Sequence, residues 1–148
     1  MNEIYMKRAI ELAEIAASQG EVPVGAVVVR QSDGEILGEG YNKRETAKSP
    51  LAHAEIEAIA QASKTLGGWR LFGCDIYVTL EPCPMCAGAI INSRIESVFF
   101  GAYDKKAGCA GSVTNLFELP FNHFPVSQGG VMEEECAELL SQFFKALR

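Results

Sequence analysis

Residues 74–95 read CDIYVTLEPCPMCAGAIINSRI, and this stretch decides the fold class. The segment CDIYVTL predicts a strand that runs directly into the corner EPCPMC. A helix, MCAGAIINSRI, follows the corner, and SVFFGAY at 97–103 predicts the next strand. A strand, a helix and a second strand in this order form a right-handed βαβ crossover. The stretch therefore indicates a sheet that is at least partly parallel and covered by helices.

The remaining segments extend this unit to the order α-β-β-α-β-α-β-(β)-α. We expect a first helix that ends at Gly20, a hairpin formed by 22–30 and 35–42, a helix over 51–68, a helical turn near 113–119, a weak strand around 124–128 and a last helix over 133–148. This order predicts an α/β fold with three α/β/α layers and a mixed five-stranded sheet with helices on both faces. Because no repeat or linker interrupts residues 1–148, we expect a single domain.

Composition and charge exclude several classes of protein. The net charge of −6 argues against a protein that coats nucleic acid, although local basic clusters remain possible contact points. No apolar run approaches the ~18 residues of a membrane span, and the N-terminus predicts an amphipathic helix instead of a signal peptide. We therefore expect a cytoplasmic protein that does not engage a membrane. In that compartment the five cysteines stay reduced, and Cys74, Cys109 and Cys136 are expected to be packed.

Cys83 and Cys86 form a Cys-x-x-Cys pair at the start of the predicted helix. Such a pair can be a redox couple, because a helix N-terminus stabilises a thiolate. It can also be half of a structural zinc site, but the chain has no second Cys-x-x-Cys to complete four ligands. Taken alone, the pair does not choose between redox and metal chemistry.

His53 changes this balance. Together with Cys83 and Cys86 it makes three ligands, which leaves the fourth tetrahedral position of a zinc ion open, as in catalytic sites. We expect the two cysteines to lie on one helix turn, about 5–6 Å apart at Cβ. The helix dipole is expected to lower the pKa of both thiols. This pattern predicts one catalytic Zn²⁺ per subunit.

Glu55 follows His53 by two residues, and such residues diverge by about 200° around a regular helix. Both can face one metal only if His53 lies at the mouth of the helix, before regular helical dihedrals begin. Ser49 and Pro50 favour a start in this region. Glu55 is then free to act as a proton shuttle that does not ligate the metal.

His-x-Glu followed by Pro-Cys-x-x-Cys after a strand is the signature of zinc-dependent nucleobase deaminases. Beyond this signature, the blocks GEVPVGAVVV, YNKRET, AHAEIEAI, YVTLEPCPMCAGAI, GAYDKKAGCAGS, FNH and FFKALR resemble the bacterial tRNA-specific adenosine deaminases over nearly the whole chain. This resemblance implies a homodimer of the cytidine-deaminase-like fold. It also implies conversion of the wobble adenosine of an arginine tRNA with the anticodon ACG to inosine.

The resemblance also implies how the anticodon stem-loop is held. Asn42 and the backbone of Ala54 match the contacts to the flipped adenine, and Asp104 matches the contact to the neighbouring nucleotide. The positions that hold the rest of the loop by charge, hydrogen bonding and stacking are Arg44, Lys106, Asn122, Phe144 and Arg148.

Two other functions stay open at this point. One is a deaminase of a free base or nucleoside, such as guanine or cytosine, with the same zinc chemistry. The other is a zinc-binding structural or interaction module without catalysis. Glu55 argues against the second, because a proton shuttle adds nothing to a structural zinc site.

Overall fold

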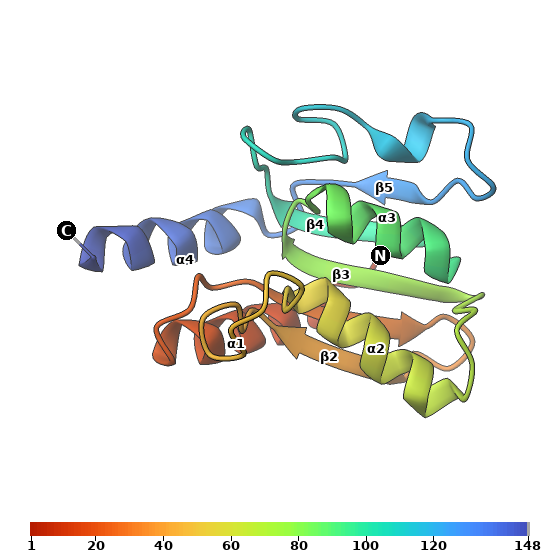
Figure 1. Ribbon diagram of the computed structural model, residues 1–148, viewed down its shortest axis with the longest axis horizontal. Coiled ribbons are helices and arrows are strands. Elements are labelled where there is room, and N and C mark those ends of the chain that lie inside the picture. The colour runs from red at the N-terminus through yellow and green to blue at the C-terminus, as the bar shows by residue number, and fades with distance from the viewer. Residues whose placement is uncertain (148) are drawn as a thin grey trace.

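The computed structural model describes residues 1–147, and its elements follow the predicted order (Figure 1). The helices are α1 (Glu3–Ser18), α2 (Ala54–Leu66), α3 (Pro84–Ser93), η1, a 3₁₀ turn (Leu116–Glu118), and α4 (Glu133–Ala146). The strands are β1 (Gly25–Arg30), β2 (Ile36–Tyr41), β3 (Cys74–Leu80), β4 (Ser97–Ala102) and β5 (Val126–Gln128). Arg148, one of the predicted RNA-contacting residues, lies outside the described residues.

The strands form one mixed sheet in the order β2-β1-β3-β4-β5. β1 pairs antiparallel with both β2 and β3, whereas β3–β4 and β4–β5 are parallel. α2 connects β2 to β3, and α3 connects β3 to β4, so both helices are crossover connections between strands of the same direction. The predicted mixed five-stranded sheet is confirmed, including the short strand at 126–128.

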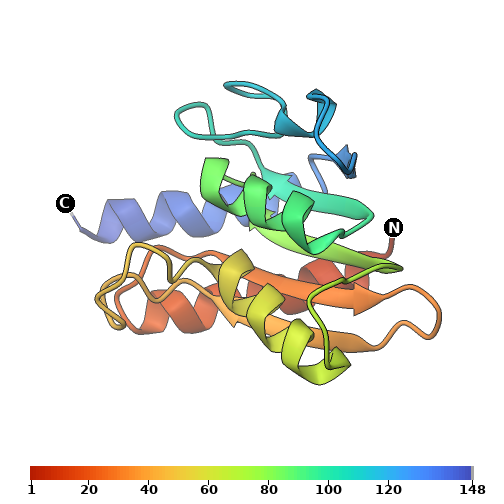
Figure 2. The same ribbon diagram turned by 45° about the vertical axis from the view of Figure 1, so that its right-hand side comes forward.

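The helices make two outer layers around this sheet. α2 and α3 lie side by side on one face, with α1 and α4 on the other (Figures 1 and 2). On the first face the core is built from small and β-branched side chains such as Ala58, Val78 and Ile90. On the second face Met6, Leu12 and Tyr77 pack together. The three-layer α/β/α architecture is therefore confirmed, because each face of the sheet has its own apolar core.

Close packing against glycines sets the position of α2. A Cβ on Gly40 of β2 would lie 2.3 Å from the carbonyl oxygen of Ala54 and 2.7 Å from the amide nitrogen of Ala58. These atoms belong to the first turns of α2, so the start of that helix lies directly on the backbone of β2. Only glycine permits this approach.

We expect Gly40→Ala to reduce the free energy of unfolding by about 1–3 kcal/mol, because the added methyl overpacks the interface. It should also lower kcat/KM, since the displaced turn carries Glu55. Gly88→Ala in α3 is the matched control, because nothing lies within 4 Å of the added Cβ. In a helix the same change stabilises by about 0.5–1 kcal/mol. Urea unfolding of both variants checks this, and equal midpoints would contradict it.

The cysteines outside the candidate metal site are packed in the interior. Cys74, Cys109 and Cys136 are buried and unbonded to one another, as predicted. Among residues 1–147, none of the helices combines the length and the apolar character that a bilayer crossing requires.

Candidate active site

His53 lies at the mouth of α2. It is the N-cap residue, with extended dihedrals of φ −80° and ψ 153°, and regular helix begins only at Ala54. The predicted irregular start is therefore present, and it allows His53 and Glu55 to face the same space although they are two residues apart. Glu55, in the first turn, is only 4% exposed.

The two cysteines lie at the mouth of α3, after the carboxyl end of β3. Cys83 is the N-cap residue, with φ −76° and ψ 175°, and Cys86 lies in the first turn. Pro84 follows the cap directly, where its missing N–H leaves no intrahelical bond unmade. Because β2 and β3 have the same direction, the helices that follow them both begin at one edge of the sheet.

The three donor atoms have separations that fit a tetrahedral zinc ion. His53 Nδ1 lies 3.6 Å from Cys83 Sγ and 3.5 Å from Cys86 Sγ. With Zn–N of about 2.0–2.1 Å and Zn–S of about 2.3 Å, tetrahedral angles place nitrogen and sulfur about 3.6 Å apart. All three atoms lie within 4.8 Å of one another, and they are the one such group in residues 1–147. The donor set therefore suits zinc with one open position.

The thiols differ from the expectation that the helix dipole lowers both pKa values. A hydrogen bond from Cys86 lowers the pKa of Cys83 to about 4, assisted by His53, against an opposing effect of burial. The same hydrogen bond and burial raise the pKa of Cys86. Two neighbouring thiolates repel each other, so the second cysteine of the pair loses its proton less readily than the first. A divalent cation bound to both would offset that repulsion.

Glu55 is a buried carboxyl whose pKa lies close to neutral pH. Burial is the main cause that raises its pKa to about 7, and its own backbone N–H partly opposes this shift. A group that titrates near neutral pH can both accept and release a proton during turnover. Its carboxyl lies on the same cavity as His53 and Cys83.

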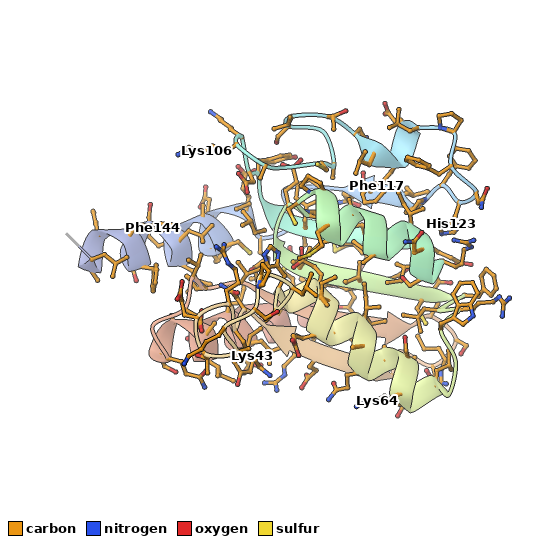
Figure 3. The ribbon with its side chains drawn as sticks, viewed as in Figure 1. Lys43, Lys64, Lys106, Phe117, His123 and Phe144 are labelled. Atoms are coloured by element: carbon orange, nitrogen blue, oxygen red, sulfur yellow. The ribbon has the colours of Figure 1, made fainter. Side chains whose placement is uncertain are left out.

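That cavity has a volume of about 570 Å³ and opens at the edge of the sheet where α2 and α3 begin. Its wall combines the candidate metal site, the loop after β2, the loop after β4 and the middle and end of α4. Six of the predicted substrate-binding residues line it: Asn42, Arg44, Ala54, Asp104, Lys106 and Phe144. Figure 3 places Lys106 and Phe144 toward the same end of the molecule.

Asn122 is the exception among the described candidates. It is exposed in the loop before β5 and is not among the residues that line the cavity. Its neighbour His123 contacts the carbonyl oxygen of Ile95, two residues before β4 begins, and Figure 3 shows His123 at the end of the molecule away from Phe144. A role for Asn122 in binding thus stays a prediction.

Known proteins resemble this chain over its whole length. A family model of MafB19-like deaminases matches residues 1–148. The chain belongs to this deaminase family. It is 53% identical to a tRNA-specific adenosine deaminase of Bacillus subtilis, over 99% of this chain and 91% of the relative. It is 47% identical to a tRNA-specific adenosine deaminase of Aquifex aeolicus, over 99% and 95% of the two chains.

Solved structures agree with the fold. A structure from a study of A-to-I editing by tRNA:A34 deaminases at the wobble position has a TM-score of 0.89 and 41% identity, covering 94% of this chain and all of that chain. A guanine deaminase from Nitrosomonas europaea has a TM-score of 0.80 at 22% identity, covering 97% and 84%, and shares the fold. The resemblance to tRNA-specific adenosine deaminases is thereby confirmed.

Two candidate side chains of this deaminase already hold backbone atoms. Asn42, 6% exposed, donates its Nδ2 to the carbonyl of Val22 and accepts the N–H of Arg44 at Oδ1. Asp104 accepts the N–H groups of Lys106 and Ala107 at Oδ1. These hydrogen bonds fix the orientation of both side chains in the cavity wall. Only the donor and acceptor positions that they leave unused are available to a ligand.

Sequence reasoning missed two buried glutamates of the deaminase, Glu21 and Glu81, each 2% exposed. Both carboxylates accept hydrogen bonds from loops that carry candidate substrate contacts. The sequence does carry one signal for them, because each glutamate borders an apolar strand. An acidic residue that is buried beside such a strand needs hydrogen-bond donors around it. Tyr103 also lines the cavity and is about half exposed.

Proposed function

We propose that the protein deaminates adenosine to inosine at the wobble position of a tRNA anticodon stem-loop, with an arginine tRNA of anticodon ACG as substrate. The observation that carries this proposal is the composition of the cavity. The buried carboxyl of Glu55 and two of the three candidate metal donors line it, together with exposed cationic and aromatic side chains. The identity to tRNA-specific adenosine deaminases over nearly the whole chain supports the same assignment.

His53, Cys83 and Cys86 would hold one Zn²⁺ per subunit. A zinc ion there would lower the pKa of a bound water from 15.7 to about 7, which makes hydroxide available at neutral pH. The chain contributes three donors on two helix mouths, so the relative position of α2 and α3 sets the geometry of the site.

Glu55 would move the protons. Its carboxylate accepts a proton from the attacking water and delivers it to the ring nitrogen of adenine. It then takes the proton of the hydroxyl now bonded to the ring carbon and gives it to the departing amine, so the carbon–nitrogen bond breaks, ammonia leaves and a carbonyl replaces the exocyclic amine, with one water consumed. A pKa of about 7 suits both directions of this transfer.

The remaining cavity residues would hold the RNA. Asn42 and the backbone of Ala54 contact the flipped adenine, and Asp104 contacts the nucleotide beside it. Arg44 and Lys106 are exposed cations suited to phosphates, and the 45% exposed ring of Phe144 can stack on a base. We propose the same purpose for Asn122 and Arg148, in a cytoplasmic homodimer of single-domain subunits.

Turnover of separate substrates tests this function. We expect the zinc-loaded protein to form inosine in an anticodon stem-loop that carries ACG and to leave free adenosine, guanine, cytosine and cytidine unchanged. Ammonia release and inosine content are the measurements. Ammonia from a free base, with the stem-loop unchanged, would identify a nucleobase deaminase with the same metal chemistry. No ammonia from any substrate, with zinc bound, would indicate a module without catalysis.

A further inference from the structure

Glu21 lies beneath the loop that follows β2. Its Oε1 accepts the N–H of Glu45 at 3.1 Å, and its Oε2 accepts both the N–H and the hydroxyl of Thr46 at 2.6 Å. Burial raises the pKa of Glu21, but these hydrogen bonds outweigh burial and hold it below its usual value. The carboxylate therefore stays ionised at neutral pH and binds two successive backbone N–H groups within the exposed turn of this loop.

Glu81 has the same relation to the loop that follows β4. Its Oε1 accepts the N–H of Asp104 at 3.0 Å, and its Oε2 accepts the N–H groups of Ala110 and Ser112, each at 3.0 Å. The hydroxyl of Ser112 adds a fourth hydrogen bond. A Cβ on Gly108 would lie 2.3 Å from Glu81 Cδ, so a glycine lets the loop close onto the carboxylate.

These two loops line the mouth of the cavity and carry its cations. Arg44 is directly before the residues held by Glu21, and Lys106 lies between the residues held by Glu81. Within residues 1–147 neither cation makes an ion pair with a carboxylate. The position of each cation therefore depends on its loop backbone, and each loop backbone is held from below by a buried carboxylate.

We propose that Glu21 and Glu81 are positioning residues that pre-organise the two loops for substrate binding. This inference rests on the proposed function, because it assigns the loops to RNA. A loop that is ordered before binding loses less conformational entropy when the substrate arrives. Each glutamate thus acts on affinity through its loop, while the proton transfers depend on Glu55.

Glu21→Gln tests the inference, since the amide keeps the shape but replaces one of the two accepting oxygens with an NH2 group, which cannot accept a backbone N–H. We expect KM for the ACG stem-loop to rise about two- to tenfold, the cost of ordering a side chain on binding, with little change in kcat. Hydrogen exchange of the 43–47 amides should accelerate. Glu14→Gln, which removes the same charge from an exposed position of α1, is the control and should change neither.

A double-mutant cycle separates positioning from general destabilisation. If Glu21 acts through Arg44, then Glu21→Gln should raise KM much less in an Arg44→Ala background than in the wild type. Thr46→Val, which removes one of the three hydrogen bonds, provides a milder variant if Glu21→Gln folds poorly. Ser112→Ala with Lys106→Ala forms the corresponding cycle for Glu81.

The outcomes distinguish the two proposals. Wild-type turnover of the stem-loop tests the proposed function, whereas the ratio of variant to wild-type KM tests the positioning role. Faster amide exchange with an unchanged KM would overturn positioning and leave the function intact. Fully additive effects of Glu21→Gln and Arg44→Ala would overturn it as well. A wild type without activity on the stem-loop would refute both.

Discussion

Glu55→Gln is expected to lower kcat by about 10²- to 10⁴-fold, the usual contribution of general acid–base catalysis. Gln has nearly the same shape as Glu, so it fills the same buried position, but it cannot accept a proton. The three candidate metal ligands are unchanged by this substitution. We therefore expect the variant to keep its fold, its zinc content and its affinity for the stem-loop while it loses turnover.

Glu57→Gln is the matched control for this experiment. Glu57 lies on the same helix, faces Lys43 at 4.0 Å and is absent from the cavity wall. Its substitution also removes one negative charge, only two residues further along the chain. Because Glu57 lies at the surface, turnover should stay within about twofold of wild type. Undiminished kcat in Glu55→Gln would disprove the proton shuttle.

Cys83→Ala is expected to abolish zinc binding at stoichiometric metal and to lower turnover by more than about 1,000-fold. The substitution leaves only His53 and Cys86 as donors, and two donors do not complete a catalytic site. Lowering the pKa of water from 15.7 to about 7 corresponds to roughly 12 kcal/mol, and this contribution is lost. Metal analysis measures the zinc content of the purified variant, and steady-state kinetics measures its turnover.

Cys136→Ala provides the comparison for the metal experiment. Cys136 is 1% exposed on α4 and packs in the core on the other face of the sheet, so its loss should leave the metal content at one per subunit. The redox interpretation makes the opposite forecast. A wild type that binds no zinc, and whose Cys83 and Cys86 interconvert between dithiol and disulfide, would refute the metal site.

The metal-binding candidates could be predicted from the sequence because their pattern is local. Strand, corner and helix follow one another around Cys83 and Cys86, and the spacing of His53 and Glu55 required an irregular helix start. The structure has that start, with His53 as the N-cap residue of α2. Strand period, helix period and turn residues act over a few residues, so they can be read along the chain.

The protonation of the cysteine pair needed the tertiary structure. Both thiols lie at the start of α3, and the helix dipole alone predicts the same shift for each. Their pKa values move in opposite directions, because the two side chains interact with each other and Cys86 is fully buried whereas Cys83 is partly exposed. Burial and the contact between two side chains are properties of packing, and no local pattern encodes them.

The chain's own sequence determined the order of elements, the mixed sheet and the donor set of the candidate metal site. Only the tertiary structure decided how the cavity mouth is built. Glu21 holds backbone groups 24 and 25 residues away, and Glu81 holds groups 23 to 31 residues away. Their partners are mainly amide N–H groups, which every residue except proline carries, so no side-chain motif marks them. Long-range pairing with the backbone is visible only after the chain has folded.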